Sequence, residues 1–199
     1  MEHYYSEQPG SRIRIREIEA FLRGNKLRFL ASSGVFSKQR IDPGTELLIE
    51  KAIINPDWTI LDLGCGYGAL GIALKKAYPS LRVVMTDINK RAVMLARRNA
   101  ELNNVKVEIF QGDMFNSLPF EKPFFDSILL NPPMSAGRRI CVGMIQQSFE
   151  WLKHGGLFQL VARHRKGGRT LMEYMYELFG NVDTLARKKG FHVYCSVKE

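Results

Sequence analysis

The sequence predicts an α/β fold in which a mostly parallel sheet carries helices on both faces. Short apolar runs alternate along the chain with segments of helical apolar spacing. The first of these runs, residues 60–63, leads directly into a turn with alternate glycines at Gly64, Gly66 and Gly68. A polar residue lies near the end of four of the runs: Asp62, Asp87, Asp113 and Asn131. Because parallel strands bring their carboxyl ends to one edge of a sheet, these side chains are expected to line a single ligand crevice.

The amino-terminal part of the chain predicts a small β element. Within residues 11–37, two apolar-polar runs flank the pair Gly24-Asn25, which suits a hairpin turn. We therefore interpret residues 1–40 as an amino-terminal β extension of the main domain. With 199 residues, of which 45% are hydrophobic, the chain can bury one substantial core, and a single domain over residues 1–199 is the natural count.

Residues 41–199 form the predicted core, and their elements follow in order along the chain. Asp42 suits the N-cap of a first helix that extends to residue 53, with Pro43 in its first turn. The sheet then has seven strands, of which the last is antiparallel. The later elements are strands at 60–63, 81–85, 105–110, 124–130 and 157–162, helices at 70–78, 90–102, 137–153 and 168–179, and a closing antiparallel pair of strands at 182–186 and 191–197.

The glycine turn suits a nucleotide-like ligand. Gly64, Gly66 and Gly68 place no side chain there, so a ligand can approach the bare backbone and the amides at the start of the next helix. Asp62, at the end of the strand, can accept a hydrogen bond from a bound amine. Two plainer interpretations stand beside this one. Tight strand-to-helix turns also need glycine for packing, and Asp or Asn at a strand end often serves as a helix cap or loop residue.

Together these residues resemble the class I methyltransferases, which use S-adenosylmethionine (SAM). The glycine turn is similar to the first motif of that family, and Asp87 stands where its acidic residue holds the two ribose hydroxyls. Gly112 and Asp113 fall where the family contacts adenine. The resemblance implies SAM as the cofactor and a Rossmann-like fold, since seven strands are the count expected of this superfamily.

Three further segments resemble the small-domain group of that superfamily, which includes bacterial ribosomal RNA guanine-N2 methyltransferases and short single-domain archaeal relatives. They are residues 3–9, residues 33–37 and the sequence Asn131-Pro132-Pro133. The likeness spans nearly the whole chain. It implies a set of cofactor-binding residues, in which Phe36 and Thr45 approach the methionine end of SAM: Asp62, Gly64, Cys65, Gly66, Gly68, Asp87, Ile88, Asp113, Met114, Asn131, Phe36 and Thr45.

The turn Asn131-Pro132-Pro133 suits methyl transfer to an amine. The lone pair of a nucleobase amine is delocalised into the ring, so it must be freed and aimed at the sulfonium methyl group. The Asn131 side-chain oxygen and the Pro132 carbonyl, held rigid by consecutive prolines, can accept the two amine hydrogens and favour a pyramidal nitrogen. No strong base is needed when the proton leaves after transfer. The plainer interpretation is a loop that two prolines impose at the end of a strand.

Met134 departs from the small-domain pattern, which usually has an aromatic residue here to stack on the target ring. A thioether still offers a polarizable contact to a ring, although a weaker and less directional one. We expect Met134 to complete the catalytic turn by packing against a flipped base. An aromatic side chain is expected to help, with Phe36, Tyr5 and Tyr67 as the candidates.

The chain carries a net charge of +9 and has a pI near 9.6, and such a charge favours a polyanionic partner. Arg138 and Arg139 follow the proposed catalytic turn by a few residues, so we expect them to bind a backbone phosphate of an RNA substrate, ribosomal RNA in particular. The other basic clusters suit ordinary solvated surfaces. They are Arg12, Arg14 and Arg16; Arg23, Lys26 and Arg28; Arg163, Arg165, Lys166 and Arg169; and Arg187, Lys188 and Lys189.

Cysteine and histidine spacing indicates neither a disulfide framework nor a metal site. Cys65, Cys141 and Cys195 are far apart in the sequence, and the four histidines lack metal-ligand spacing. The sequence shows no signal peptide and no apolar stretch long enough to span a bilayer. We therefore expect a cytoplasmic protein that binds neither a metal ion nor a membrane.

Three other functions stay open on the sequence. A dinucleotide-dependent oxidoreductase fits because Gly64, Gly66 and Ala69 satisfy the loose dinucleotide fingerprint. A protein glutamine N-methyltransferase would share the Asn-Pro-Pro turn, although a tyrosine follows that turn there instead of Met134. A non-catalytic RNA-binding module would keep SAM only as a structural ligand. Within RNA, guanine N2 is the first choice of target and adenine N6 the second, since both present an exocyclic amine.

Overall fold

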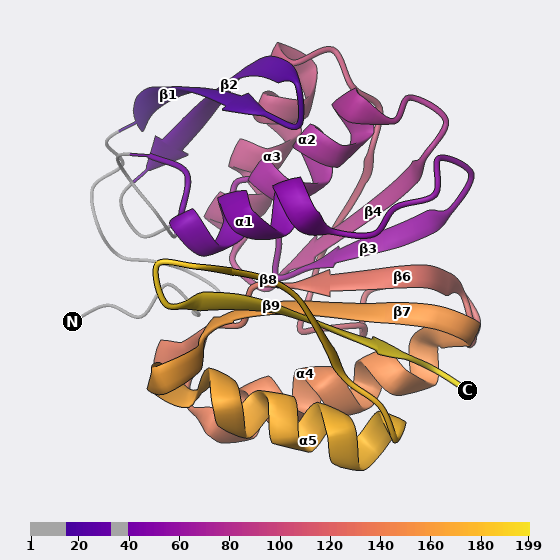
Figure 1. Cartoon of the computed structure of the whole chain (residues 1–199). Helices are drawn as coiled ribbons and strands as arrows, with labels where there is room; N and C mark the ends of the chain where they lie inside the picture. Colours follow the sequence, from indigo (N-terminus) through magenta and orange to yellow (C-terminus); the bar gives the residue numbers. More distant parts are fainter. Residues whose placement is uncertain (1–14, 33–39) are drawn as a thin grey trace.

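The computed structural model describes residues 15–32 and 40–199, with a seven-stranded sheet through its centre (Figure 1). The strand order is β5-β4-β3-β6-β7-β9-β8. Strands β3 to β7 are parallel, and β9 runs antiparallel to both of its neighbours, which confirms the predicted sheet. The strands are β3 (Thr59–Leu63), β4 (Arg82–Asp87), β5 (Glu108–Gln111), β6 (Phe125–Leu130), β7 (Leu152–Arg163), β8 (Asp183–Lys188) and β9 (Phe191–Val197).

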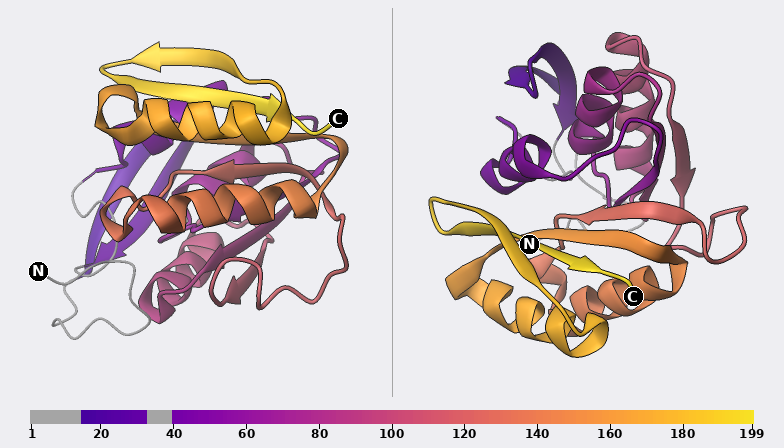
Figure 2. Two further views of the ribbon diagram at one scale, coloured as in Figure 1. Left: turned by 90° about the horizontal axis from the view of Figure 1, so that it is seen from below. Right: turned by 45° about the vertical axis from the view of Figure 1, so that its right-hand side comes forward.

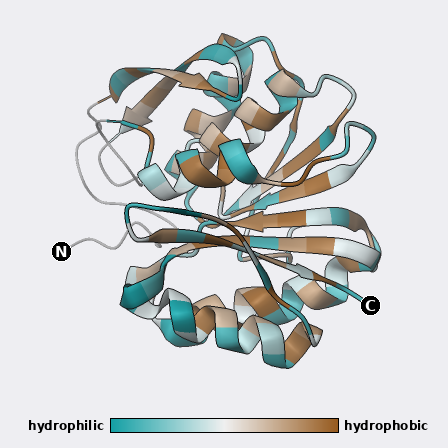
Figure 3. Ribbon diagram, viewed as in Figure 1, coloured by the Kyte–Doolittle hydropathy of each residue, from teal (hydrophilic) through white to brown (hydrophobic). Residues whose placement is uncertain are grey.

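Helices cover both faces of the sheet, with α1, α2 and α3 on one face and α4 and α5 on the other (Figure 1 and Figure 2). Ile60 and Leu61 are both fully buried but belong to different apolar clusters, because successive side chains of a strand point to opposite faces. Hydrophobic residues accordingly gather along the strands (Figure 3). The helices are α1 (Pro43–Lys51), α2 (Ala69–Ala77), α3 (Lys90–Leu102), α4 (Arg138–Trp151) and α5 (Arg169–Phe179).

The carboxyl ends of β3, β4 and β6 meet at one edge of the sheet. The register places Leu63 opposite Thr86 on one side and opposite Leu130 on the other. The residues that follow these strands, including the glycine turn and Asn131, therefore lie together at this edge. This arrangement is the one that alternating strands and helices predict.

The junction between α4 and β7 differs from the sequence prediction. The helix expected over 137–153 ends at Trp151, and β7 begins at the next residue and is longer than the expected strand at 157–162. Trp151 is buried and stacks on Phe115 with ring centroids 5.3 Å apart. Its carbonyl accepts a hydrogen bond from the Phe124 amide at 2.8 Å, so packing at the start of β6 ends the helix earlier than the glycines would.

The amino-terminal β element is present as a hairpin of β1 (Ile15–Leu22) and β2 (Asn25–Ser32). Its two-residue turn is Arg23-Gly24, with φ of 45° and 79°, one position earlier than the predicted Gly24-Asn25. Arg23 sits in the turn because its amide donates to the Glu50 carboxylate at 2.6 Å and its guanidinium donates to the Ala52 carbonyl at 3.1 Å. Docking against α1 therefore sets the turn position.

The predictions for residues 3–9, for residues 33–37 and for Arg12 and Arg14 lie outside the described residues. Within the ranges that the structure describes, no helix is both long and apolar enough to cross a membrane.

Candidate active site

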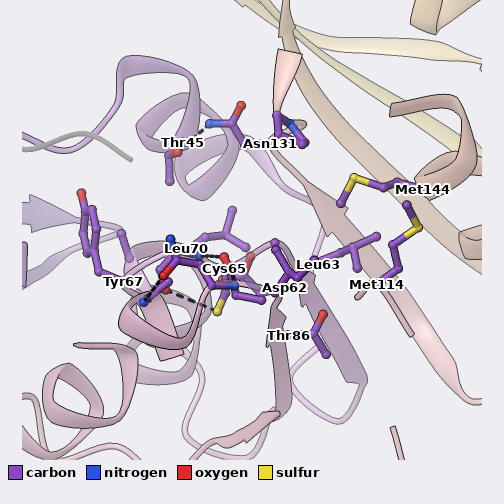
Figure 4. Close-up of a pocket in the computed structure, with 18 of the residues that line it drawn as sticks. Thr45, Asp62, Leu63, Cys65, Tyr67, Leu70, Thr86, Met114, Asn131 and Met144 are labelled. Atoms are coloured by element: carbon purple, nitrogen blue, oxygen red, sulfur yellow. Dashed lines mark hydrogen bonds between the residues drawn. The ribbon is translucent and has the colours of Figure 1, made fainter. Parts of the chain in front are cut away.

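A cavity opens at the carboxyl edge of β3, β4 and β6 (Figure 4). Nine of the twelve residues predicted to bind the cofactor line it: Asp62, Gly64, Cys65, Gly66, Asp87, Ile88, Met114, Asn131 and Thr45. Gly68 and Asp113 do not line it, and Phe36 lies outside the described residues. Asp113 is exposed, whereas its neighbours Gly112 and Met114 face the cavity.

The glycine turn after β3 is held by hydrogen bonds to β4. The amides of Gly64 and Cys65 both donate to the Thr86 carbonyl at 2.9 Å. The amide of Gly66 donates to Oδ2 of Asp87 at 2.8 Å. These three amides therefore already have partners within the protein, so here the turn offers a ligand a surface without side chains at Gly64 and Gly66 and no free amide donors.

The glycines of the turn serve two different purposes. A Cβ at Gly66, where φ is +57°, would meet no protein atom within 4 Å. A Cβ at Gly68, where φ is +92°, would lie 2.9 Å from both the Ile72 Cδ1 and the Met85 Cε. Gly66 therefore keeps the cavity open, while Gly68 allows α2 to pack against β4. The packing interpretation therefore accounts for Gly68, while the ligand interpretation stays a prediction at Gly66, where the space is open.

Two carboxylates line the cavity next to this turn, of which Asp62 is buried and Asp87 half-buried. Asp62 is 4% exposed, its Oδ2 accepts a hydrogen bond from the Gly71 amide at 2.9 Å, and burial raises its pKa to about 7. Asp87 accepts from the amides of Asn89 and Gly66, both at 2.8 Å, and burial raises its pKa to about 6. A cationic ligand would favour the ionised form of both groups, so this pair suits a positively charged partner.

Asn131 is anchored from the side of α1 (Figure 4). Its side-chain nitrogen donates to Oδ2 of Asp42 at 3.0 Å and to Oγ1 of Thr45 at 2.8 Å. A primary amide has two N–H donors, so these contacts use both and assign the carbonyl oxygen as the group that can accept a further bond. Oδ2 of Asp42 also caps α1 by accepting from the Thr45 amide at 2.9 Å.

The two prolines after Asn131 form a tight turn. The Met134 amide donates to the Pro132 carbonyl at 2.9 Å, and Pro133 has φ −75° and ψ 75°, the geometry of an inverse γ-turn. A carbonyl oxygen has two lone pairs, so Pro132 can accept a second hydrogen bond. Both prolines are buried, and Pro133 lines the cavity beside Asn131.

Met134 lies outside the lining of the cavity. It begins the short helix η1 (Met134–Ala136), is 38% exposed, and contacts the turn after β7, named η2 (His164–Gly168). A Cβ at Gly167 would lie 2.6 Å from the Met134 Cε, so a side chain at this position would displace the end of the Met134 side chain from the contact. The predicted packing of Met134 on a base stays a prediction.

The remaining predicted residues lie at the rim or in the core. Arg138 and Arg139 are exposed on the first turn of α4. Tyr67 lines the cavity and is 3% exposed, with its ring 6.0 Å from that of Phe29. Tyr5 lies outside the described residues. In the part of the chain that the structure describes, no three His, Cys, Asp or Glu residues are grouped as metal ligands.

Two residues of the site that were not predicted from the sequence have particular roles. Asp42 appeared only as a helix cap, although its carboxylate also holds Asn131. Met144 of α4 is buried and lines the cavity opposite the glycine turn, where its Cε is 3.6 Å from a Cβ at Gly64. No local sequence pattern could have predicted either role, because each depends on a contact with a distant part of the chain.

The sheet order, the glycine turn after β3 and the acid at the end of β4 define a Rossmann-like, SAM-dependent methyltransferase. The chain belongs to the methyltransferase small domain family, which matches residues 26–195. The residues present fit SAM, because the open surface at Gly66 and the carboxylates of Asp62 and Asp87 suit a cationic nucleoside. SAM is therefore the cofactor of this enzyme.

Two relatives illustrate the range of the family. The chain is 37% identical to the uncharacterized protein YbxB of Bacillus subtilis over 195 residues, which are 96% of each chain. It is 33% identical over 177 residues to the ribosomal RNA small subunit methyltransferase C of Pseudomonas entomophila. That match covers 87% of this chain and 52% of the relative, so this chain spans about half the length of that ribosomal RNA methyltransferase.

Solved structures share the fold. The T. thermophilus 16S rRNA N2 methyltransferase in complex with AdoMet and guanosine superposes with a TM-score of 0.81 and 26% identity. The match covers 96% of this chain and 52% of that one. A methyltransferase from Pyrococcus furiosus has the same fold, with a TM-score of 0.64 and 22% identity over 74% of this chain and 78% of that one.

Proposed function

We propose that this enzyme transfers the methyl group of SAM to an exocyclic amine of a nucleobase in RNA, with guanine N2 of ribosomal RNA as the target. The observation that carries the proposal is the orientation of the Asn131 amide. Asp42 and Thr45 use both of its N–H donors, so the amide can offer the substrate only its oxygen. A site that presents acceptors is suited to a substrate that brings donors, as an amine does.

The two acceptors lie on consecutive residues. Asn131 offers its side-chain oxygen and Pro132 its main-chain carbonyl, and the γ-turn through Pro133 holds that carbonyl in place. When both accept a hydrogen from one amine, its lone pair is directed away from the ring and towards the cavity. SAM supplies a methyl group that its sulfonium already activates. The partial negative charge of the two oxygens stabilises the positive charge that develops on the amine nitrogen, and the proton leaves that nitrogen after transfer.

An RNA substrate is favoured over a protein glutamine by two observations. The net charge of +9 suits a polyanion, and relatives of this chain are named ribosomal RNA methyltransferases. A glutamine amide would meet the same pair of acceptors, so it is the second candidate. We expect the enzyme to work in the cytoplasm, together with its proposed ribosomal RNA substrate. A dinucleotide-dependent oxidoreductase is unsupported, since the chain belongs to a methyltransferase family.

The test is methyl transfer from labelled SAM to unmodified ribosomal RNA, followed by nucleoside mass spectrometry. We expect N2-methylguanosine with the wild-type protein. Asn131→Ala removes one of the two acceptors and should lower kcat by about 100-fold to 1,000-fold, the cost of losing one preorganised hydrogen bond to a charged transition state. The affinity for SAM, measured by titration calorimetry, should stay within about threefold, because the carboxylates that favour a cation are unchanged.

The matched control is Asn55→Ala, since Asn55 is exposed before β3, at the opposite edge of the sheet, and bonds only to its own loop. It should leave turnover unchanged. Wild-type turnover by Asn131→Ala would refute the proposed role of the turn. Label on protein glutamine in place of RNA would refute the proposed substrate.

A further inference from the structure

Two basic clusters that are separate in the sequence lie together at the carboxyl edge of the sheet. Strand β7 ends at Arg163, and the turn η2 follows it; the turn between β8 and β9 lies beside them because Arg163 pairs with Phe191. The His164 amide donates to the Gly190 carbonyl at 3.0 Å and joins the two turns. We name the combined surface the basic edge. Its residues are Arg163, Arg165, Lys166, Arg187, Lys188 and Lys189.

The charges of the basic edge are available to a partner. All six side chains are exposed, and among the described residues none of the six forms a salt bridge with an acid. Arg169, the remaining member of the first cluster, pairs with Glu173 at 2.8 Å and is therefore left out of the set. Figure 3 shows hydrophilic residues at the β8–β9 turn and at the start of α5. Cations of one sign and without acidic partners favour a polyanion.

The backbone beneath these charges is firmly held. The His164 ring stacks on that of His192 with centroids 4.4 Å apart, and its Nδ1 lies 2.7 Å from the hydroxyl oxygen of Tyr194. Tyr194 is fully buried in β9. The guanidinium of Arg163 lies 4.3 Å from the centre of the Phe191 ring. A rigid support reduces the entropy lost when the basic side chains bind a ligand.

The basic edge adjoins the catalytic turn. Strands β6 and β7 lie side by side (Figure 1) and are parallel, so Asn131, which follows β6, and Arg163, which ends β7, lie at the same edge of the sheet. Met134, two residues after Pro132, rests on Gly167 of η2. This contact joins η2 to the catalytic turn, so the proposed acceptors and the cations lie on adjoining segments, as a site for a nucleotide and its flanking phosphates requires.

We propose that the basic edge binds the RNA phosphates that flank the target nucleotide, and that Met134 keeps this surface in register with the catalytic turn. The inference rests on the proposed function, because it takes the substrate to be RNA. It assigns the sugar-phosphate contacts to the turns after β7 and β8, in addition to the predicted contacts of Arg138 and Arg139 on α4. Such contacts position the substrate and carry no base specificity.

The experiment compares two charge-reversal variants, Arg165→Glu with Lys166→Glu and Lys188→Glu with Lys189→Glu. The matched control is Arg98→Glu with Lys106→Glu, which reverses two exposed cations near β5, at the other end of the sheet. The probe is unmodified small-subunit ribosomal RNA transcribed in vitro. Filter binding at several salt concentrations reports affinity for the RNA, and labelled transfer reports kcat and KM. Calorimetry with SAM reports an intact fold.

Each test variant should raise the Kd and KM for RNA by about tenfold or more at physiological salt and should reduce the salt slope of log Kd by about one to two. The kcat and the SAM affinity should stay within about twofold, because the acceptors and carboxylates are untouched. Losses no larger than those of the control, or a loss in kcat with KM unchanged, would overturn the inference. RNA that binds to the basic edge without being methylated would refute the proposed function alone, and a wild-type protein that binds no RNA would refute both.

Discussion

A single carboxylate oxygen of Asp42 connects the first helix of the core to the catalytic turn by holding Asn131. The Asn131 Nδ2 and the Asp42 Oδ2 are 3.0 Å apart although the residues are separated by 89 positions in the chain. The same oxygen accepts from the Thr45 amide at 2.9 Å and so begins α1. The start of a helix and the orientation of the proposed catalytic amide therefore share one atom, which acts on the amide together with Oγ1 of Thr45.

Asp42→Ser is expected to separate these two roles. Serine is also a good N-cap, so the free energy of unfolding should change by less than about 1 kcal/mol. Its shorter side chain cannot reach Asn131, and the loss of a charge-assisted hydrogen bond of about 1.5–3 kcal/mol should lower kcat about tenfold to 100-fold. Asp42→Asn, whose amide oxygen can accept the same bonds, should retain most of the activity. Equal kcat values for Asp42→Ser and wild type would show that Asp42 does not position Asn131.

Gly66→Ala is expected mainly to weaken SAM binding, and Gly68→Ala mainly to destabilise the fold. The new methyl group at Gly66 enters the cavity without touching protein, so SAM affinity should fall about tenfold or more, while unfolding free energy falls by about 1–2 kcal/mol from the positive φ. At Gly68 the methyl group meets Ile72 and Met85, so the loss of stability should be larger, about 2–5 kcal/mol. Chemical denaturation and SAM calorimetry measure the two effects. Similar profiles for both variants would contradict the division of roles.

The affinity for SAM is expected to rise with pH. In the free protein the pKa values of Asp62 and Asp87 are about 7 and about 6, and a cationic ligand favours their ionised forms. Kd should therefore fall as the pH rises from about 5.5 to about 8, and binding near pH 6 should release protons. Calorimetry in buffers of different ionisation enthalpy detects that release. A Kd independent of pH, or proton uptake on binding, would exclude this coupling.

The same two pKa values predict the pH dependence of stability without SAM. Both folded values lie above the ordinary value of 3.8, so between about pH 4 and about pH 7 the folded state holds more protons than the unfolded state. The contribution of these groups to the free energy of unfolding is therefore present at low pH and is lost as the pH rises through that window. Asp62→Asn should flatten the dependence. Urea denaturation across this pH range measures the free energy of unfolding of both proteins. A steeper pH dependence for the variant than for the wild type would contradict the prediction.

Gly167→Ala is expected to disturb the contact between η2 and the catalytic turn. The new Cβ would lie 2.6 Å from the Met134 Cε, so the Met134 side chain must leave its contact with η2, and KM for RNA should rise by about tenfold if this contact aligns the two turns. The control is Gly180→Ala at the end of α5, where φ is +75° and a Cβ meets nothing within 4 Å. Both variants should lose about 1–2 kcal/mol of stability from the positive φ. An equal KM for RNA in the two variants would show that the Met134 contact does not help to position the RNA.

Much of the fold could be predicted because it depends on local patterns. The alternation of apolar runs and helical spacing indicated the strands and helices of the sheet, and Asp42 and Pro43 marked the start of α1. The predicted boundaries were wrong where tertiary packing decides the end of a helix or the position of a turn. Trp151 stacks on Phe115 and ends α4 early, and the contacts of Arg23 with α1 set the hairpin turn.

By itself, the sequence determined the sheet, the glycine turn and the acids and amide at the strand ends, because periodicity and glycine content report backbone conformation within a few residues. Only the tertiary structure decided which glycine faces the cavity and which packs a helix, that Asp113 is exposed beside it, and that Asp42 holds Asn131. It also decided that two basic clusters form one surface. These features are distances between residues far apart in the chain, and no local pattern encodes them.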